Sequence, residues 1–392
     1  MRRTIKSVGA TLLCIGILAL TGCTSIMNNV IQKELGYTNA EVEALQITPD
    51  PDTKLTRTTA MLVGAISDLI QQEDATTQTE VQPEGDSTAD MSFINEPEPI
   101  GKEEIFEIPV ENGSIPMVLV WPKNYQKQKE PIPVVMMIHG GSYNSGDYNG
   151  YRRFTSILAN ELKAVIAFPE YRLAPEYKFP TAPDDVYAAW RWLLVHAQEL
   201  GLDTGKTAIA GDSAGGNLAA GLSIRLYANG EPQPDSVALL YPNLTLTPTV
   251  YPSRLYFGGV DGKTYLLTGD MMQRIVATYL EDPSQATAPY ASPLVMIQGL
   301  VQIDGVVNEL APYALDATLP VVLAPTLVIV AQADPLRDEA ILYSAVLRHV
   351  GTESTATVYK GMLHGFPMFD KIFAEGRKAI RQTADFISEH WK

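Results

Sequence analysis

An alternation of short apolar runs with amphipathic segments restricts the fold of this chain more than any other feature. Six runs have the length and composition of buried strands: 134–138, 164–168, 206–210, 237–241, 326–331 and 355–359. Apolar residues recur at helical spacing in 152–162, 184–200, 216–227, 338–350 and about 373–391. Continuous apolar strands that alternate with helices are typical of a parallel sheet covered on both faces. The sequence therefore predicts the α/β class, with a mostly parallel central sheet flanked by helices.

Two segments depart from this alternation. A hairpin is expected at 104–109 and 115–121, where Glu111-Asn112-Gly113 separates two strand-like runs. Some 80 residues lie between the strands 237–241 and 326–331, with helices expected at 271–280 and 306–313. Ligands of α/β proteins bind at the carboxyl ends of the strands, and an insertion after a strand lies over that edge. We therefore expect about 245–322 to form a helical cap over a site.

The composition excludes several classes of function. The net charge is −16, and no basic cluster that would bind nucleic acid stands out. Both cysteines lie within the first 23 residues, and no two of the five histidines have metal-ligand spacing. We expect no nucleic-acid partner, no metal and no cofactor, and the sequence predicts no oligomeric state.

The N-terminus has the pattern of a targeting signal. Basic residues Arg2, Arg3 and Lys6 precede an apolar run at 8–20, which is short for a membrane span and typical of a signal peptide. The run ends in Leu-Thr-Gly-Cys23, which resembles the lipobox of bacterial lipoproteins. That resemblance implies cleavage after residue 22, lipidation of Cys23 and attachment to a membrane, the outer one in a Gram-negative cell. An ordinary signal peptide and an uncleaved anchor remain alternatives.

Residues 23–101 separate this signal from the predicted catalytic body at 102–392. Apolar residues at helical spacing in 59–72 predict a helix that packs on the body and contributes to the cap, or docks elsewhere. Residues 71–101 are rich in Thr, Gln, Glu, Asp and Pro, which predicts a flexible linker. The domain organisation is thus a signal, a lipidated tether and one body.

A candidate nucleophile lies where the strand 206–210 meets a helix. Gly211-Asp212-Ser213-Ala214-Gly215 has the form G-x-S-x-G, a strand-to-helix turn that exposes the serine hydroxyl. Small residues are needed there because strand and helix backbones approach closely. The alternative is a glycine-rich turn whose serine only caps the helix.

His364 is the candidate base, because it follows the last strand in a loop, whereas His196 and His349 lie late in helices and His390 near the chain end. Asp334 ends the buried strand 326–331 and would orient the imidazole and stabilise its charged form. The order Ser213, Asp334, His364 is that of α/β-hydrolases. Asp338 is the rival acid, although its place at the start of a helix favours capping.

An oxyanion formed at the serine needs N–H donors. The N–H of Ala214, which follows the nucleophile, points toward this position at the helix N-terminus. Further donors are expected from the loop after His139, in which Gly140, Gly141 and Ser142 follow a strand end. A simple turn is the alternative for this loop.

These motifs together resemble the bacterial hormone-sensitive-lipase-like carboxylesterases, from about residue 132 to the C-terminus. The matching stretches are His139-Gly-Gly, Tyr171-Arg-Leu-Ala-Pro-Glu176, Phe179-Pro180, Asp184-Asp185, Gly211-Asp-Ser-Ala-Gly-Gly216, Asp334-Pro-Leu-Arg-Asp338 and His364-Gly-Phe366. The resemblance implies an α/β-hydrolase fold with a helical cap and hydrolysis of short to medium acyl esters. It also implies Ser213 as nucleophile, Asp334 as acid and His364 as base.

The chain departs from that family in three places. Ser142 replaces the usual third glycine of the loop, the stretch 296–322 is longer than usual, and residues 24–100 do not match. A serine peptidase or amidase on the same fold remains an alternative function, because the same triad serves both reactions. A non-catalytic envelope lipoprotein is a further alternative.

Overall fold

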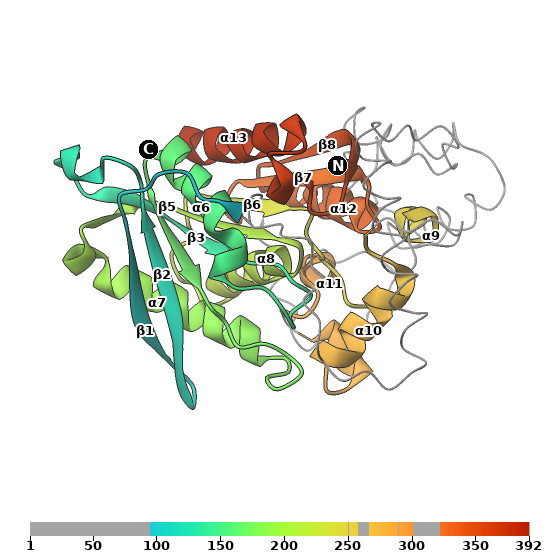
Figure 1. Cartoon of the computed structure of the whole chain (residues 1–392). Helices are drawn as coiled ribbons and strands as arrows, with labels where there is room; N and C mark the ends of the chain where they lie inside the picture. The colour runs from blue at the N-terminus through green and yellow to red at the C-terminus, as the bar shows by residue number, and fades with distance from the viewer. Residues whose placement is uncertain (1–94, 250, 258–265, 289, 301–321, 392) are drawn as a thin grey trace, which may run out of the picture.

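The structure is a computed structural model, which describes residues 95–249, 251–257, 266–288, 290–300 and 322–391 (Figure 1). Its strands are β1 Lys102–Val110, β2 Gly113–Trp121, β3 Ile132–Ile138, β4 Val165–Pro169, β5 Leu202–Asp212, β6 Ser236–Leu240, β7 Thr326–Ala333 and β8 Ser354–Leu363. The helices of the body are α6 Tyr148–Leu162, α7 Thr181–Leu200, α8 Ser213–Ala228, α12 Arg337–His349 and α13 Ala374–Glu389. All six predicted buried strands and all five predicted body helices are present.

The strands form one eight-stranded sheet in the order β1-β2-β4-β3-β5-β6-β7-β8. The predicted hairpin pairs β1 with β2, and β2 pairs antiparallel with β4. From β4 to β8 every pairing is parallel. The predicted mostly parallel sheet is confirmed, and the parallel strands bring their carboxyl ends to one edge.

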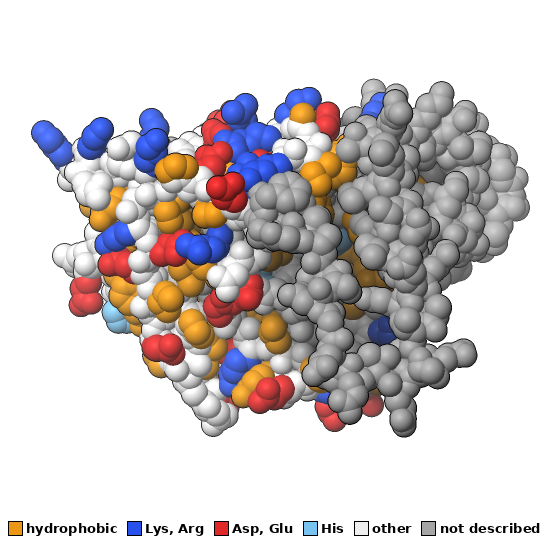
Figure 2. Space-filling model, viewed as in Figure 1, with side chains coloured by type: hydrophobic (Ala, Val, Ile, Leu, Met, Phe, Trp, Pro, Cys, Tyr) orange, Lys and Arg blue, Asp and Glu red, His pale blue; other side chains and the backbone are white. Residues whose placement is uncertain are grey.

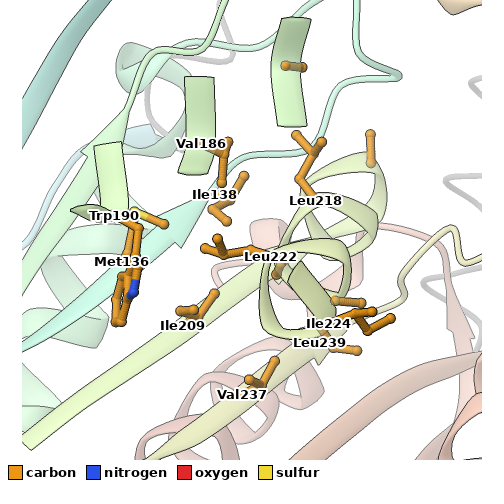
Figure 3. Packing of buried hydrophobic residues seen from close by; sticks show 14 of the residues in the cluster. Met136, Ile138, Val186, Trp190, Ile209, Leu218, Leu222, Ile224, Val237 and Leu239 are labelled. Carbon is orange, nitrogen blue, oxygen red and sulfur yellow. The ribbon is translucent and has the colours of Figure 1, made fainter. Parts of the chain in front are cut away.

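Both faces of the sheet are covered, which explains the continuous apolar runs (Figure 1). Successive side chains of β3 point to opposite faces, so that Met136 and Ile138 pack in one core and Val135 and Met137 in the other. The first core contains α7, α8 and α12, and Trp190 and Leu222 meet the strands there (Figure 3). The second core contains α6 and α13.

The segment between β6 and β7 carries short helices near the carboxyl edge of the sheet (Figure 1). Its elements are α9 Pro252–Phe257, α10 Gly269–Tyr279, the 3-10 helix η2 Pro283–Thr287 and α11 Pro293–Leu300. The helix predicted at 271–280 is confirmed as α10, which begins at an N-cap bond from Met271 N–H to the Thr268 hydroxyl. The sequence did not predict α9 or α11, whose six and eight residues are too few for a clear period. The helix predicted at 306–313 lies outside the described residues.

The predicted signal, Cys23 and the helix at 59–72 also lie outside the described residues. The end of the predicted linker is bound to α6 and α13: Glu98 N–H donates to Ser156 Oγ at 2.9 Å, and Arg377 pairs with the Glu98 carboxylate at 2.7 Å. Figure 2 shows Lys and Arg side chains along the upper edge of the view, both to the left of α13 and over it as Figure 1 draws this helix. None of the described helices has the length and hydrophobicity of a membrane span.

Candidate active site

Ser213 lies in a strained turn between β5 and α8. Its φ is +52°, a left-handed value that is uncommon for a non-glycine residue. The turn requires glycine on both sides: a Cβ on Gly211 would lie 2.3 Å from the Gly215 oxygen, and one on Gly215 would lie 2.1 Å from the Ile138 oxygen. The predicted strand-turn-helix is thus present, with Ser213 exposed to a cavity at its tip.

His364 connects Ser213 to Asp334. Its Nε2 lies 3.0 Å from Ser213 Oγ, and its Nδ1 lies 2.8 Å from Asp334 Oδ2. His364 and Asp334 each follow directly on the end of a parallel strand, β8 and β7, which places them at the same edge as the serine. The geometry fits a serine hydroxyl that donates to Nε2 and an Nδ1–H that donates to the carboxylate. The structure therefore brings together the three predicted residues.

The charge balance favours protonation of His364. Burial lowers the pKa of His364, but the negative charge of Asp334 and the hydrogen bond to it outweigh burial, and the pKa is raised. Asp334 is fully buried and also accepts a hydrogen bond from Leu336 N–H at 2.9 Å. The Tyr241 ring packs edge-on against His364 at 4.8 Å between centroids. His364 is held in one orientation and is suited to take a proton from the serine.

Three of the other histidines, His139, His196 and His390, have structural partners. His196 Nδ1 lies 2.8 Å from the oxygen of Trp192, one turn earlier in α7. His390 follows directly on α13, and its Nδ1 lies 2.8 Å from the oxygen of Phe386 in the last turn of that helix. His139 is fully buried, and burial lowers its pKa to about 4, so it is neutral at neutral pH. Its ring stacks on Tyr171 at 4.2 Å. Among the histidines, it is His364 that lies between Ser213 and Asp334.

Asp338 does not cap α12, and that prediction was wrong. The helix begins at Arg337 with Leu336 in the N-cap position, and the Leu336 side chain makes no capping hydrogen bond. The buried Asp338 carboxylate instead accepts Ser253 N–H at 2.7 Å and pairs with the Arg337 guanidinium at 2.8 Å. Because Ser253 lies in α9, which the sequence did not predict, this partner could not be foreseen. Asp338 fixes the insertion to the body, whereas Asp334 meets the histidine.

The loop after β3 presents two of its three predicted donors to the cavity. Gly141 and Ser142 line the cavity with Ala214 and Ser213. No acceptor for the N–H groups of Gly141 and Ser142 is found among the described residues outside regular helices and strands. A Cβ on Gly141, whose φ is +109°, would lie 2.1 Å from the Ser145 oxygen, so this position requires glycine.

Gly140 does not offer its N–H to the cavity, which corrects its predicted place among the donors. Its N–H donates to Asp212 Oδ1 at 2.8 Å and also meets the Tyr151 hydroxyl at 2.9 Å. A Cβ on Gly140 would lie 2.7 Å from Asp212 Oδ2, so glycine is needed for close approach. Of the predicted donor residues, Gly141, Ser142 and Ala214 line the cavity, with Gly140 as an anchor beside them.

Asp212, the residue before the nucleophile, holds several parts of the site together. It is buried, and its carboxylate accepts from Gly140 N–H, from the Tyr151 hydroxyl at 2.9 Å and from the Tyr241 hydroxyl at 3.2 Å. Burial raises its pKa to about 6, while the hydrogen bond from Tyr151 acts in the opposite direction. Asp212 thus connects the elbow, the donor loop and the aromatic ring beside His364.

A cavity of about 910 Å³ lies over these groups. One wall is the apolar side of α10, with Met271, Met272, Ile275 and Val276. The lining also includes Asn243 and the threonines 245, 247 and 249, whose hydroxyls form a chain of hydrogen bonds at 2.7 and 2.8 Å. A cavity with an apolar wall and a few polar groups near a nucleophile can hold an acyl chain and an ester carbonyl. The described part of the chain holds no group of three or more metal-ligating side chains.

Comparisons with known proteins agree with this geometry. A family model described as alpha/beta hydrolase fold matches residues 135–368. An ethyl acetate hydrolase of Pseudomonas putida is 29% identical over 257 residues, which cover 65% of this chain and 73% of the relative. The esterase LipI of Mycobacterium tuberculosis is 30% identical over 256 residues, which cover 65% of this chain and 71% of that protein.

Solved structures of esterases have the same fold. An esterase of Pyrobaculum calidifontis is 32% identical and superposes with a TM-score of 0.69, over 86% of this chain and 99% of that one. The carboxylesterase EstE1, cloned from a metagenomic library, is 33% identical with a TM-score of 0.67, over 77% of this chain and 93% of that one.

Proposed function

Because the chain belongs to the alpha/beta hydrolase fold family whose model spans residues 135–368, we propose that it is a serine carboxylesterase. The observation that carries the proposal is the continuous series from Asp334 through His364 to Ser213, at 2.8 and 3.0 Å, in the wall of a cavity. Relatives named as esterases support the same reaction class.

The reaction proceeds in two halves. Ser213 Oγ attacks the ester carbonyl carbon while His364 Nε2 takes the serine proton, and the carbonyl electrons move to the oxygen. The N–H groups of Gly141, Ser142 and Ala214 stabilise that oxyanion. Collapse expels the alcohol, which receives the proton from His364, and leaves an acyl-serine. Water then attacks the acyl-serine while His364 takes a proton from it. Collapse of this second intermediate breaks the bond to Ser213 Oγ, which regains the proton from His364, and the carboxylic acid departs.

The substrate class follows from the shape of the cavity. A volume of about 910 Å³ and the apolar wall of α10 suit acyl chains of short to medium length. We assign to the insertion between β6 and β7 the role of a cap that selects this chain, since α10 belongs to it. No feature of the described site favours an amide over an ester.

A series of p-nitrophenyl esters from acetate to dodecanoate tests this proposal on the purified full chain. We expect kcat/KM to be highest for short or medium acyl groups and to fall for the longest ones. Activity confined to long-chain emulsions would overturn the substrate class. Hydrolysis of the matching p-nitroanilides without hydrolysis of the esters would favour an amidase.

We also propose that the mature protein is lipid-anchored through Cys23 in a bacterial envelope. The support is the order of basic residues, the apolar run at 8–20 and Leu-Thr-Gly-Cys23. Several acyl chains on one cysteine would hold it stably at a membrane, in a Gram-negative cell the outer one. Labelled palmitate should enter the wild-type protein and not Cys23→Ser. Equal labelling of both, or a wild-type protein free in the periplasm, would contradict the anchor.

A further inference from the structure

We propose that Tyr279 of α10 is a positioning residue for the oxyanion loop, which it holds through a stack on Tyr143; this rests on the proposed esterase function. Tyr143 directly follows Gly141 and Ser142, the two loop residues whose N–H groups face the cavity. The rings of Tyr143 and Tyr279 are parallel within 7°, with centroids 3.9 Å apart. Both side chains are fully buried. The stack therefore joins the insertion to the donor loop.

The loop needs such support because its backbone is strained. Ser142 has a φ of +58° and Tyr143 a φ of +63°, so two consecutive non-glycine residues adopt the left-handed conformation. L-residues adopt this conformation in succession only where their surroundings fix it. The conformation of Ser142 fixes the peptide group that carries its own N–H relative to the rest of the loop. A small relaxation here would turn an N–H away from the oxyanion.

The loop is held at both of its ends. At the start, Gly140 N–H is bound to Asp212. At the end, the Tyr143 carbonyl accepts Ala174 N–H at 2.9 Å, and the Tyr143 ring meets Tyr279. The ring contact is the part of this support that comes from the insertion.

Tyr279 is itself firmly placed. Its carbonyl accepts Phe179 N–H at 2.9 Å, and its ring meets Phe179 edge-on at 5.9 Å. Ile275 and Val276, one turn earlier in α10, line the cavity. One short helix thus contacts both the space for substrate and the loop that stabilises the oxyanion.

The rings, and not the hydroxyls, make this contact. Neither Tyr143 nor Tyr279 has a partner for its buried hydroxyl within the described residues. A buried hydroxyl without a partner is unfavourable, so phenylalanine should replace either tyrosine without loss. Leucine, by contrast, removes the aromatic face. Comparing the phenylalanine and leucine variants therefore distinguishes a role of the stacked rings from a role of the hydroxyls.

The test compares Tyr279→Phe and Tyr279→Leu in the full chain, with p-nitrophenyl acetate as substrate. We expect the kcat of Tyr279→Phe to stay within about twofold of the wild-type value. Tyr279→Leu should lose about 10- to 100-fold in kcat with little change in KM, since misplaced oxyanion donors weaken binding of the transition state and not of the substrate. The inhibition constant of a trifluoromethyl ketone, whose adduct carries the same oxyanion, should rise in parallel. Trp192→Leu, which removes a ring stack at 4.2 Å on His196 in α7, is the control and should keep kcat.

The double variant decides whether the two rings act together. Tyr143→Leu should match Tyr279→Leu, and the double variant should lose no more than either single one. Tyr143→Leu also supplies the measurement if Tyr279→Leu does not fold. An unchanged kcat in these leucine variants, or losses that multiply in the double variant, would overturn the role of the stack. Either result would leave the esterase function standing as long as the wild-type protein hydrolyses the ester. A wild-type protein without hydrolysis would instead contradict the proposed function, on which this inference rests.

Discussion

The carboxylate of Asp212 accepts a hydrogen bond from the N–H of Gly140 at 2.8 Å, which ties the residue before the nucleophile to the start of the oxyanion loop. This bond spans 72 positions of sequence. It fixes the loop against the elbow and leaves the next two N–H groups of the loop open to the cavity. Two parts of the site that carry out different steps therefore share one anchor.

Asp212→Asn should weaken this anchor. The carboxylate accepts from Gly140 N–H and from two tyrosine hydroxyls, whereas an amide offers one acceptor oxygen. An unsatisfied buried donor costs about 1–3 kcal/mol, so the free energy of unfolding should fall by that amount and kcat should fall with it. Urea unfolding and ester hydrolysis measure the two effects. Tyr151→Phe, which removes one donor and leaves the carboxylate in place, is the matched control and should lose less in both assays.

Asp334→Asn and Asp338→Asn should differ sharply in their effect on kcat. Asp334→Asn removes the charge that orients His364 and should lower kcat by about 10⁴-fold, as is typical of triads. Asp338→Asn alters the bond to Ser253 in α9 and should act on stability far more than on kcat. Rates per folded molecule, with folding checked by circular dichroism, make the comparison. Equal losses of kcat in both variants would contradict the assignment of the acid.

Activity should rise with pH through the pKa of His364. The base acts in its neutral form, and Asp334 raises the pKa of His364 despite burial, so the acid limb of kcat/KM should lie above the ordinary histidine value of about 6.5. Asp334→Asn removes the main cause of the increase and should move this limb to lower pH. A profile of kcat/KM for both proteins checks this. An acid limb that does not move would show that another group controls it.

Ser142→Gly should relieve strain without loss of activity. The left-handed backbone at φ +58° is unfavourable for serine, and glycine should stabilise the protein by about 1 kcal/mol after its own entropy cost. The backbone N–H remains, so kcat should stay within about threefold of wild type. Ser142→Ala keeps the strain and removes the hydroxyl. A similar loss of kcat in both variants would show that the hydroxyl takes part in the reaction.

The sequence predicts those features that depend on local pattern and chain order. The sheet was predicted from its apolar runs. The triad of Ser213, Asp334 and His364 was predicted because each residue follows a strand, and these strands end at one edge of the sheet. The use of the Gly140 N–H could not be predicted, because its acceptor depends on how β3 and β5 are aligned.

Contacts between the insertion and the body could not be predicted from the sequence either. The partner of Asp338 lies 85 positions away in a six-residue helix that has no clear period. The stack of Tyr143 on Tyr279 joins two residues that carry no motif. Such contacts depend on packing in three dimensions, which a single sequence does not reveal.

Hydrolysis of p-nitrophenyl acetate by the purified wild-type chain and by Ser213→Ala tests the central claim most directly. If Ser213 is the nucleophile, the wild type should turn over the ester, and the variant should lose about 10⁴-fold or more in kcat, with only the contribution of binding and the oxyanion donors left. His364 and Asp334 are untouched in this variant, so their 2.8 Å contact should persist. Equal rates for the two proteins would contradict the account.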